Sequence, residues 1–141
     1  IDMVQVYQQQ VAQAGIKVNI VKAPADGFWG EVWMKEPVVT TGWGQRPADQ
    51  ILNEAYRGGA PWNETYWNDP EFDKLLDQAR QELDFEKRKA LYHQLQTILY
   101  ERGGSFIPLH TNQAVATTAR VSGLQPVFTD AVQYHLIHVS D

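Results

Sequence analysis

The sequence predicts an α/β domain in which a mixed sheet carries flanking helices. Near the N-terminus, apolar residues at helical spacing lead through a short turn into alternating apolar and polar residues, the pattern of an α/β unit. Further along, a continuous apolar and β-branched run is typical of a buried strand. Two amphipathic segments then follow each other, and their apolar stripes need a common surface on which to pack.

The first predicted elements are a helix and a strand. Residues 4–14 place apolar side chains at helical spacing, and Asp2 is suited to cap the start of the helix. Gly15 is suited to end it, because a helix C-terminus favours a residue in the left-handed region. Residues 16–20 then alternate between apolar and polar side chains, which predicts a half-buried strand.

The next stretch predicts a helix, a strand and a second short helix. Asp26 is suited to cap a short helix that ends before Pro37. Residues 38–43 are the candidate for the buried strand, and residues 48–56 follow as a short helix. Residues 58–68 are rich in glycine, proline, asparagine and tryptophan, which predicts an ordered loop.

The clearest local pattern is a pair of helices. Asp69 suits the N-cap and Pro70 the first helical position of a helix over residues 70–83. Asp84 suits the N-cap of a second helix over residues 85–102. Both helices carry an apolar stripe, and we expect them to pack on one side of the sheet.

Three further strands complete the predicted sheet. They cover residues 105–111, 114–118 and 134–139. The absence of a clear linker or internal repeat predicts one domain over residues 1–141.

Composition excludes several functional classes. Hydrophobic residues make up 43% of the 141 residues and charged residues 21%, which is typical of a globular domain. The net charge of -5 and the lack of a basic stripe argue against nucleic acid as a partner. The chain has no cysteine, which excludes disulfides, thiolate metal ligands and cysteine nucleophiles. No run of apolar residues approaches the ~20 that a transmembrane helix needs.

The sequence also lacks the motifs of an enzyme. Its serines do not lie in a G-x-S-x-G motif, and there is no phosphate-binding G-x-x-x-x-G-K-[ST] motif. His135 and His138 are three residues apart on a predicted strand, so they point to opposite faces and do not converge on a metal ion. We therefore expect no enzymatic activity, no cofactor and no metal site.

Four stretches of the sequence carry a resemblance to known proteins. They are Gln13-Ala14-Gly15-Ile16-Lys17-Val18, Gly42-Trp43, Phe72-Asp73-Lys74-Leu75-Leu76 followed by Asp84, Arg88, Leu91 and Tyr92, and Ile107-Pro108-Leu109. Together they resemble one family, the extracellular solute-binding proteins of peptide, dipeptide and nickel ABC importers (family 5 type). The resemblance covers nearly all of the chain.

The resemblance implies the fold and the partners of such a protein. Its members are two-lobed and close on a ligand like a hinged clamp. The chain would form most of the C-terminal ligand-binding lobe of a longer protein. Its partners would be a small ligand, the missing N-terminal lobe and the permease subunits of an ABC transporter. The location would be periplasmic or extracellular, with a possible lipid anchor.

Trp43 and Arg46 are the first candidate ligand-binding residues. Trp43 ends a predicted buried strand, where α/β folds place ligands, and the matching tryptophan of the family lines the ligand pocket. Arg46 stands where many peptide binders of the family have an aspartate that holds the α-amino group of the ligand. This reversal of charge favours a ligand with an acidic group. The alternatives are that Arg46 is solvated, or that Asp49 neutralises it or itself serves as an amine anchor.

Other candidate ligand-binding residues are Trp62, Asn63 and Asn112. Trp62 and Asn63 lie in the predicted loop, whose aromatic rings need a core, a pocket or a partner to cover them. Asn112 follows the Ile107-Pro108-Leu109 strand on the ligand side of the family's lobe. The function predicted from these residues is capture of a peptide-like or other small solute, acidic solutes included, for uptake. The alternative is a protein-interaction module without a small-molecule ligand.

Overall fold

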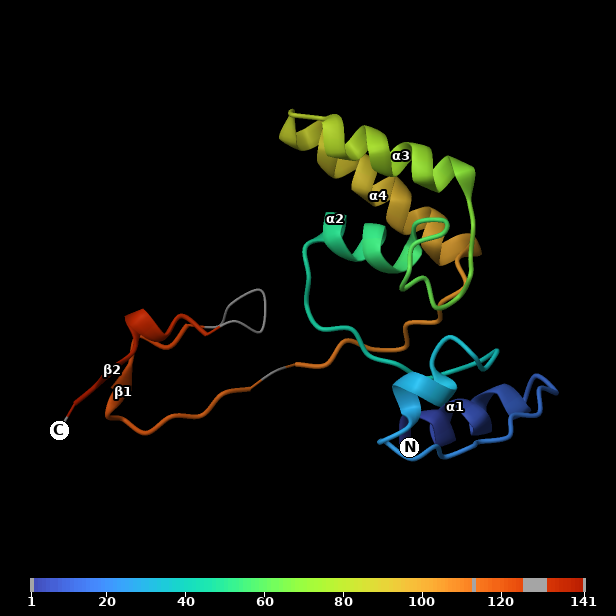
Figure 1. Cartoon of the computed structure of the whole chain (residues 1–141), viewed down its shortest axis with the longest axis horizontal. Helices are drawn as coiled ribbons and strands as arrows, with labels where there is room; N and C mark the ends of the chain where they lie inside the picture. The colour runs from blue at the N-terminus through green and yellow to red at the C-terminus, as the bar shows by residue number, and fades with distance from the viewer. Residues whose placement is uncertain (1, 113, 126–131, 141) are drawn as a thin grey trace. The chain divides into compact units, whose positions relative to one another are not determined.

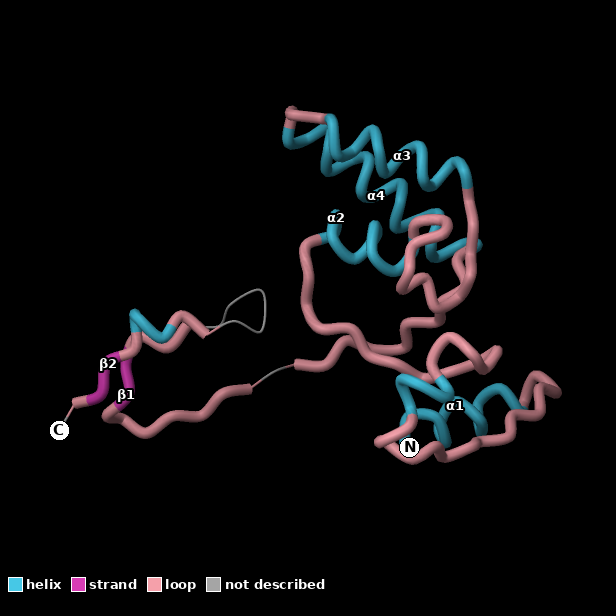
Figure 2. Tube along the Cα trace, viewed as in Figure 1, coloured by secondary structure: helices cyan, strands magenta, loops and turns pink. Residues whose placement is uncertain are grey.

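The computed structural model describes residues 2–112, 114–125 and 132–140, and most of the regular structure in them is helical (Figures 1 and 2). The helices and helical turns are α1 (Asp2–Ala12), η1 (Phe28–Val32), α2 (Ala48–Ile51), η2 (Leu52–Tyr56), α3 (Pro70–Gln81), α4 (Phe85–Arg102) and η3 (Tyr134–Leu136). Two short strands are β1 (Val121–Ser122) and β2 (His138–Val139). The chain divides into two compact units, Ile1–Thr40 and Thr41–Asp141.

The predicted mixed sheet is wrong. Among the described residues, the sheet consists of β1 and β2 alone, which pair antiparallel with Val121 opposite Val139 and Ser122 opposite His138. Residues 16–20, 38–43, 105–111 and 114–118 form no strand. The chain therefore does not show the predicted lobe architecture, a mixed sheet with flanking helices.

The physical reason is that these segments pair with no other strand among the described residues. Alternation of apolar and polar residues predicts which side chains a sheet would bury, but a strand also needs a neighbour for its backbone hydrogen bonds. Without one, the apolar side chains of these segments stay exposed: Val38 is 89%, Ile107 59% and Val115 75% exposed. The segment predicted as a strand over 134–139 is also divided, because η3 occupies its first half and β2 only its end.

The unit Ile1–Thr40 contains the predicted first helix but no core. Gly15 adopts φ 79°, as expected of a residue that ends a helix, and the Ile16 amide donates to the Val11 carbonyl at 3.1 Å. The predicted helix after Asp26 is the π-helical turn η1, in which Trp29 packs edge-on against Phe28, with ring centroids 5.1 Å apart. None of the described side chains in this unit is buried.

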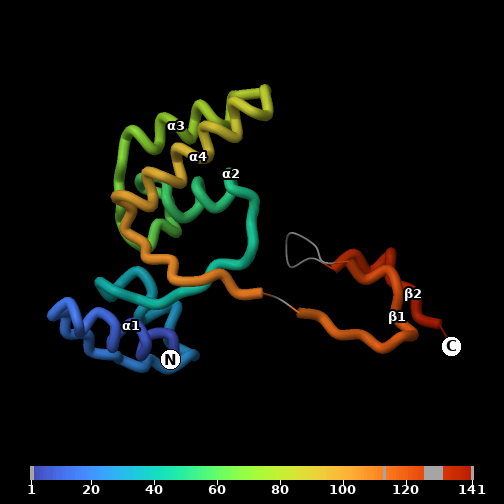
Figure 3. The backbone as a smooth tube through the Cα atoms, turned by 180° about the vertical axis from the view of Figure 1, so that it is seen from behind, coloured from blue at the N-terminus to red at the C-terminus, as the bar shows by residue number. Residues whose placement is uncertain are grey.

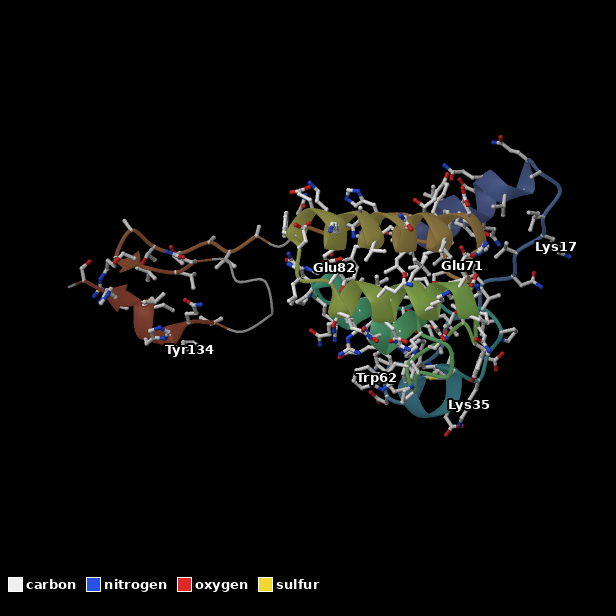
Figure 4. The ribbon with its side chains drawn as sticks, turned by 90° about the horizontal axis from the view of Figure 1, so that it is seen from above. Lys17, Lys35, Trp62, Glu71, Glu82 and Tyr134 are labelled. Atoms are coloured by element: carbon white, nitrogen blue, oxygen red, sulfur yellow. The ribbon has the colours of Figure 1, made fainter. Side chains whose placement is uncertain are left out.

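The predicted pair of helices is confirmed as the hairpin of α3 and α4, which lie side by side in both views (Figures 1 and 3). Asp69 caps α3, because its Oδ1 accepts hydrogen bonds from the Glu71 and Phe72 amides at 3.0 and 3.1 Å. Asp84 caps α4 by accepting from the Lys87 amide at 2.9 Å. Figure 4 shows Glu71 and Glu82 at opposite ends of α3.

The hairpin builds the core of the second unit. Its largest fully buried side chains are Phe72, Leu76 and Leu95. Leu52 from η2 completes the cluster, so the two helices pack on each other and on η2 rather than on a sheet. Leu83, expected in the apolar stripe of α3, lies beyond the helix end and is 91% exposed.

Candidate functional site

Two predicted ligand-binding tryptophans, Trp43 and Trp62, come together in the second unit. Their ring centroids are 6.0 Å apart, and the rings are tilted by 47°. Trp62 is 46% exposed and Trp43 is half-buried. With their charged neighbours they form a surface that we call the aromatic-arginine cluster, which consists of Trp43, Arg46, Glu54, Trp62 and Glu64.

Arg46 belongs to this cluster but is engaged within the chain. Its Cζ lies 5.0 Å from the centroid of the Trp43 ring, which is a cation–π contact. Its Nε lies 3.3 Å from Glu54 Oε2, and its Nη1 donates to the Gly44 carbonyl at 3.0 Å. Arg46 therefore pairs with Glu54, a residue absent from the predicted site, and not with Asp49.

The pair of Arg46 and Glu54 is partly shielded from water. The Arg46 and Glu54 side chains are 27% and 30% exposed. Glu54 Oε2 itself is buried and has no hydrogen-bond partner among the described residues, so its contact with Arg46 is an ion pair without hydrogen-bond alignment. Glu54 Oε1 accepts a hydrogen bond from the side chain of Gln50 at 2.9 Å, which holds the carboxylate on the surface of α2 and η2.

Glu64 is a second residue that sequence reasoning missed. Its Oε1 accepts hydrogen bonds from the Thr41 hydroxyl at 2.7 Å and from Trp43 Nε1 at 3.2 Å. The two bonds join the loop after η2 to the segment that carries Trp43. A carboxylate two residues after Trp62 in a loop rich in aromatic residues was the available signal for it.

Asn63 is buried and stabilises the conformation of the loop, and its side chain is not part of the exposed surface. It is 3% exposed, and its Nδ2 donates to the carbonyls of Arg57 and Trp67 at 3.1 and 2.7 Å. Its Oδ1 accepts from the Thr65 hydroxyl at 3.0 Å. A buried amide side chain needs such partners, so both ends of Asn63 are used in fixing the loop that presents Trp62.

Tyr56 connects this loop to the chain beyond α4. Burial raises the pKa of Tyr56, a side-chain hydrogen bond with Ser105 opposes this, and the negative charge of Glu64 raises it further. Next to Ser105, a Cβ placed on Gly104 would lie 2.7 Å from Thr65 Cβ. The close approach leaves room only for glycine and seats the segment after α4 against the loop.

Asp49 lies in a separate polar network that joins α2 to α3 and α4. Its Oδ1 accepts hydrogen bonds from the Tyr92 hydroxyl and from Asn53 Nδ2, each at 3.1 Å. Arg80 Nε lies 3.4 Å from the same oxygen. Burial raises the pKa of Tyr92 to about 12, and the hydrogen bond to the Asp49 carboxylate adds to the effect. This network is structural, since it fastens the elements that carry the cluster.

The last predicted site residue, Asn112, is exposed and makes no hydrogen bond to the cluster. The structure thus brings together Trp43, Arg46 and Trp62, and it leaves Asp49, Asn63 and Asn112 outside the cluster. In the part of the chain that is described, no group of three or more histidine, aspartate or glutamate side chains is arranged to hold a metal ion. A helix with the length and apolarity to cross a membrane does not occur in residues 2–112, 114–125 or 132–140.

Comparison with protein-family models and with curated proteins finds no match to this chain.

Proposed function

We propose that the chain belongs to the solute-binding component of an ABC importer and that the aromatic-arginine cluster contributes to the capture of a small, peptide-like solute. The observation that carries the proposal is the contact between Trp43 and Trp62, which come from separate segments of the chain. Their ring centroids lie 6.0 Å apart, and both side chains stay partly exposed. Binding pockets use aromatic walls with a few placed polar groups, and this cluster supplies both.

The rigidity of the surroundings supports a binding role. Asn63 fixes the loop under Trp62, and Glu64 ties Trp43 to the same loop. A binding surface that is held in place before the ligand arrives loses less entropy on binding. No step of this proposal requires catalysis, a cofactor or a metal ion.

The resemblance of the helix pair and the tryptophan segment to the solute-binding family supplies the rest of the proposal. It implies a location in the periplasm or outside the cell, in some members on a lipid anchor. The partners would be the permease subunits of the transporter and the missing N-terminal lobe.

A protein-interaction module is the second candidate, and exposed apolar side chains favour it. Tyr100 is 92%, Phe106 72% and Trp29 64% exposed. Exposed apolar side chains mark a surface that another protein covers where they form one contiguous patch. Under this alternative, Trp62 would contact a protein and no small solute would bind.

Thermal-shift screening of the protein that carries this chain against a library of di- and tripeptides and small organic acids separates the two candidates. We expect a binding solute to raise the melting temperature. Trp43→Ala and Trp62→Ala should each weaken binding about tenfold or more, the scale of 1.4 kcal/mol of lost contact. The control Trp29→Ala removes an exposed tryptophan from the other unit and should leave the affinity within about twofold. Absence of any solute, together with a protein complex that Trp62→Ala disrupts, would favour the interaction module.

A further inference from the structure

We infer that the tip of the α3–α4 hairpin is a docking surface for a second copy of this chain. In the inferred dimer, Leu83 and Phe85 of each copy fill a hollow beside the tip of the other copy, so that two identical contacts form around a two-fold axis. This surface contains no residue of the aromatic-arginine cluster, and the inference goes beyond the proposed function.

Two large apolar side chains are exposed at the tip although hydrogen bonds fix its conformation. Leu83 is 91% and Phe85 63% exposed. Glu82 Oε1 accepts a hydrogen bond from the Asp84 amide at 2.8 Å, and Arg88 Nη1 donates to the Glu82 carbonyl at 3.0 Å. Arg88 Cζ also lies 5.8 Å from the centroid of the Phe85 ring, which is a cation–π contact. The tip therefore presents its apolar groups in a preorganised conformation, which reduces the entropy lost on binding.

A hollow of about 330 Å³ lies at the same end of the hairpin. It is lined by Gln78, Gln81, Glu82 and Leu91. Leu91 is half-buried and packs against the core, whereas the two glutamines are exposed, so the hollow combines an apolar floor with a polar rim. Glu82, labelled in Figure 4, directly precedes Leu83, so the hollow and the exposed apolar side chains share one surface. A two-fold dimer needs this arrangement, because the same patch supplies both halves of each contact.

The charges of the tip identify a second copy as the partner that fits it. Residues 82–89 contain three carboxylates and three cations, namely Glu82, Asp84, Glu86, Lys87, Arg88 and Lys89. The whole chain has a net charge of -5, so two copies repel each other over most of their surface, but not at this neutral tip. The carboxylates come first in the segment and the cations last. An antiparallel approach of two copies therefore sets the carboxylates of one against the cations of the other.

Sedimentation equilibrium of the 141-residue chain, from micromolar to millimolar concentration, measures the association. We expect a monomer–dimer equilibrium with a dissociation constant on the order of 0.1–1 mM, because the patch is small and small interfaces give transient contacts. Leu83→Ser and Phe85→Ser should each weaken the association about tenfold or more, because each removes an apolar side chain that the dimer buries. A chain that stays monomeric at millimolar concentration would overturn the inference.

The control for these variants lies at the other end of the same helix. Tyr100→Ser removes a ring that is 92% exposed and should leave the dissociation constant within about twofold of the native value. Since all three positions are exposed, the melting temperature of each variant should stay within about 3 °C of the native value. If Leu83→Ser and Phe85→Ser melt normally and associate as the native chain does, the contact does not use the tip and the inference is wrong.

A reversal of charge tests the electrostatic argument. Lys87 is the suitable position, because Arg88 and Lys89 have contacts within the chain. Lys87→Glu leaves four carboxylates against two cations at the tip and should weaken the association about three- to fivefold. Lys17→Glu makes the same change in net charge at an exposed position of the other unit and should change the association by less than about twofold. Equal weakening by both would attribute the effect to net charge and contradict the inferred contact.

Single cysteines test where the two copies meet. Because the chain has no cysteine, Leu83→Cys and Gln78→Cys each carry one thiol. The two variants are mixed at millimolar concentration and oxidised, and mass spectrometry separates the mixed disulfide from the disulfides of identical chains. A disulfide requires the two Cα atoms to approach within about 7 Å, so the mixed disulfide should form about fivefold more than one between Leu83→Cys and Tyr100→Cys. Equal yields would show random collision and would overturn the inference.

Discussion

The α3–α4 hairpin and the unit Ile1–Thr40 both contain helices that the sequence predicted, yet only the hairpin buries side chains. Phe72, Leu76 and Leu95 all belong to the hairpin and are completely buried. In contrast, α1 has no buried residue, and Val6 on it is 52% exposed. The comparison shows that a helical pattern predicts a helix, whereas burial depends on a partner that lies within reach.

Distance along the chain explains this difference. In the hairpin, the partner follows within a few residues, because α3 ends at Gln81 and Asp84 already caps α4. Two short-range caps and a short connection bring the apolar stripes together with little loss of chain entropy. In the described residues of Ile1–Thr40, no apolar side chain of α1 or of the following segment is buried, so their pattern alone does not produce a core.

The strongest test of this comparison replaces a core residue of the hairpin. Leu76→Ala should lower the free energy of unfolding by about 2–5 kcal/mol, because it removes a fully buried side chain and leaves a cavity. The matched control Val6→Ala on α1 should change it by less than about 0.5 kcal/mol. Urea unfolding followed by circular dichroism at the helical band measures both. Equal effects of the two substitutions would break the comparison, since they would place α1 in a core of similar density.

A smaller effect is expected at the capped start of α3. Asp69→Ala should cost about 1–2 kcal/mol, the usual value for loss of an N-cap side chain. Asp69→Asn keeps an acceptor for the cap but loses the ion pair with Arg102, whose Nε lies 2.7 Å from Asp69 Oδ2, so its cost should be lower. Urea unfolding at neutral pH measures both variants. A cost for Asp69→Asn as large as that for Asp69→Ala would show that charge, and not capping, is the main contribution.

The same residue gives a dependence on pH. Burial would raise the pKa of Asp69, but hydrogen bonds from the Phe72 amide and from Arg102 outweigh it and lower the pKa below its ordinary value. A carboxyl group whose pKa is lowered in the folded state stabilises the protein above its unfolded pKa and loses this contribution as the pH falls through the folded value. The advantage of the native chain over Asp69→Asn should therefore shrink below about pH 4, when unfolding is measured across this range.

The difference between contacts with near neighbours and contacts with distant segments also explains what the sequence could predict. Helix positions and caps depend on neighbours within about four residues, and so Asp69, Asp84 and Gly15 were assigned correctly. Strands depend on partners that alternation does not identify, and the predicted sheet was wrong for that reason. Residues 38–43 were predicted to form a buried strand, yet Val38 is 89% exposed.

The candidate site divides in the same way. Loop tryptophans and a nearby arginine were recognisable as binding residue types, and the structure brings Trp43, Arg46 and Trp62 together. The carboxylates that complete the cluster, Glu54 and Glu64, were missed because their contacts join separate segments. Asp49 was one of the alternative partners that the sequence offered for Arg46, but Asp49 contacts Tyr92 and Arg80 instead.

The smallest expected effect concerns the polar contact through which α2 is joined to α4. Tyr92→Phe removes the hydrogen bond to Asp49 at 3.1 Å and should cost about 0.5–1.5 kcal/mol. The control Tyr100→Phe, on the same helix at a position that is 92% exposed, should cost almost nothing.

In the folded chain, burial first and Asp49 second raise the pKa of Tyr92 to about 12, above the unfolded value of 10.0. The unfolded state therefore releases this proton first, so the contribution of Tyr92 is complete below pH 10.0 and is lost as the pH rises through about 12. Ultraviolet titration of tyrosinate in both variants measures this shift. If Tyr92 ionises together with the exposed tyrosines, the contact with Asp49 is absent in solution, and the pair of Arg80 and Asp49 and the apolar packing around Leu52 would then join this region to the hairpin.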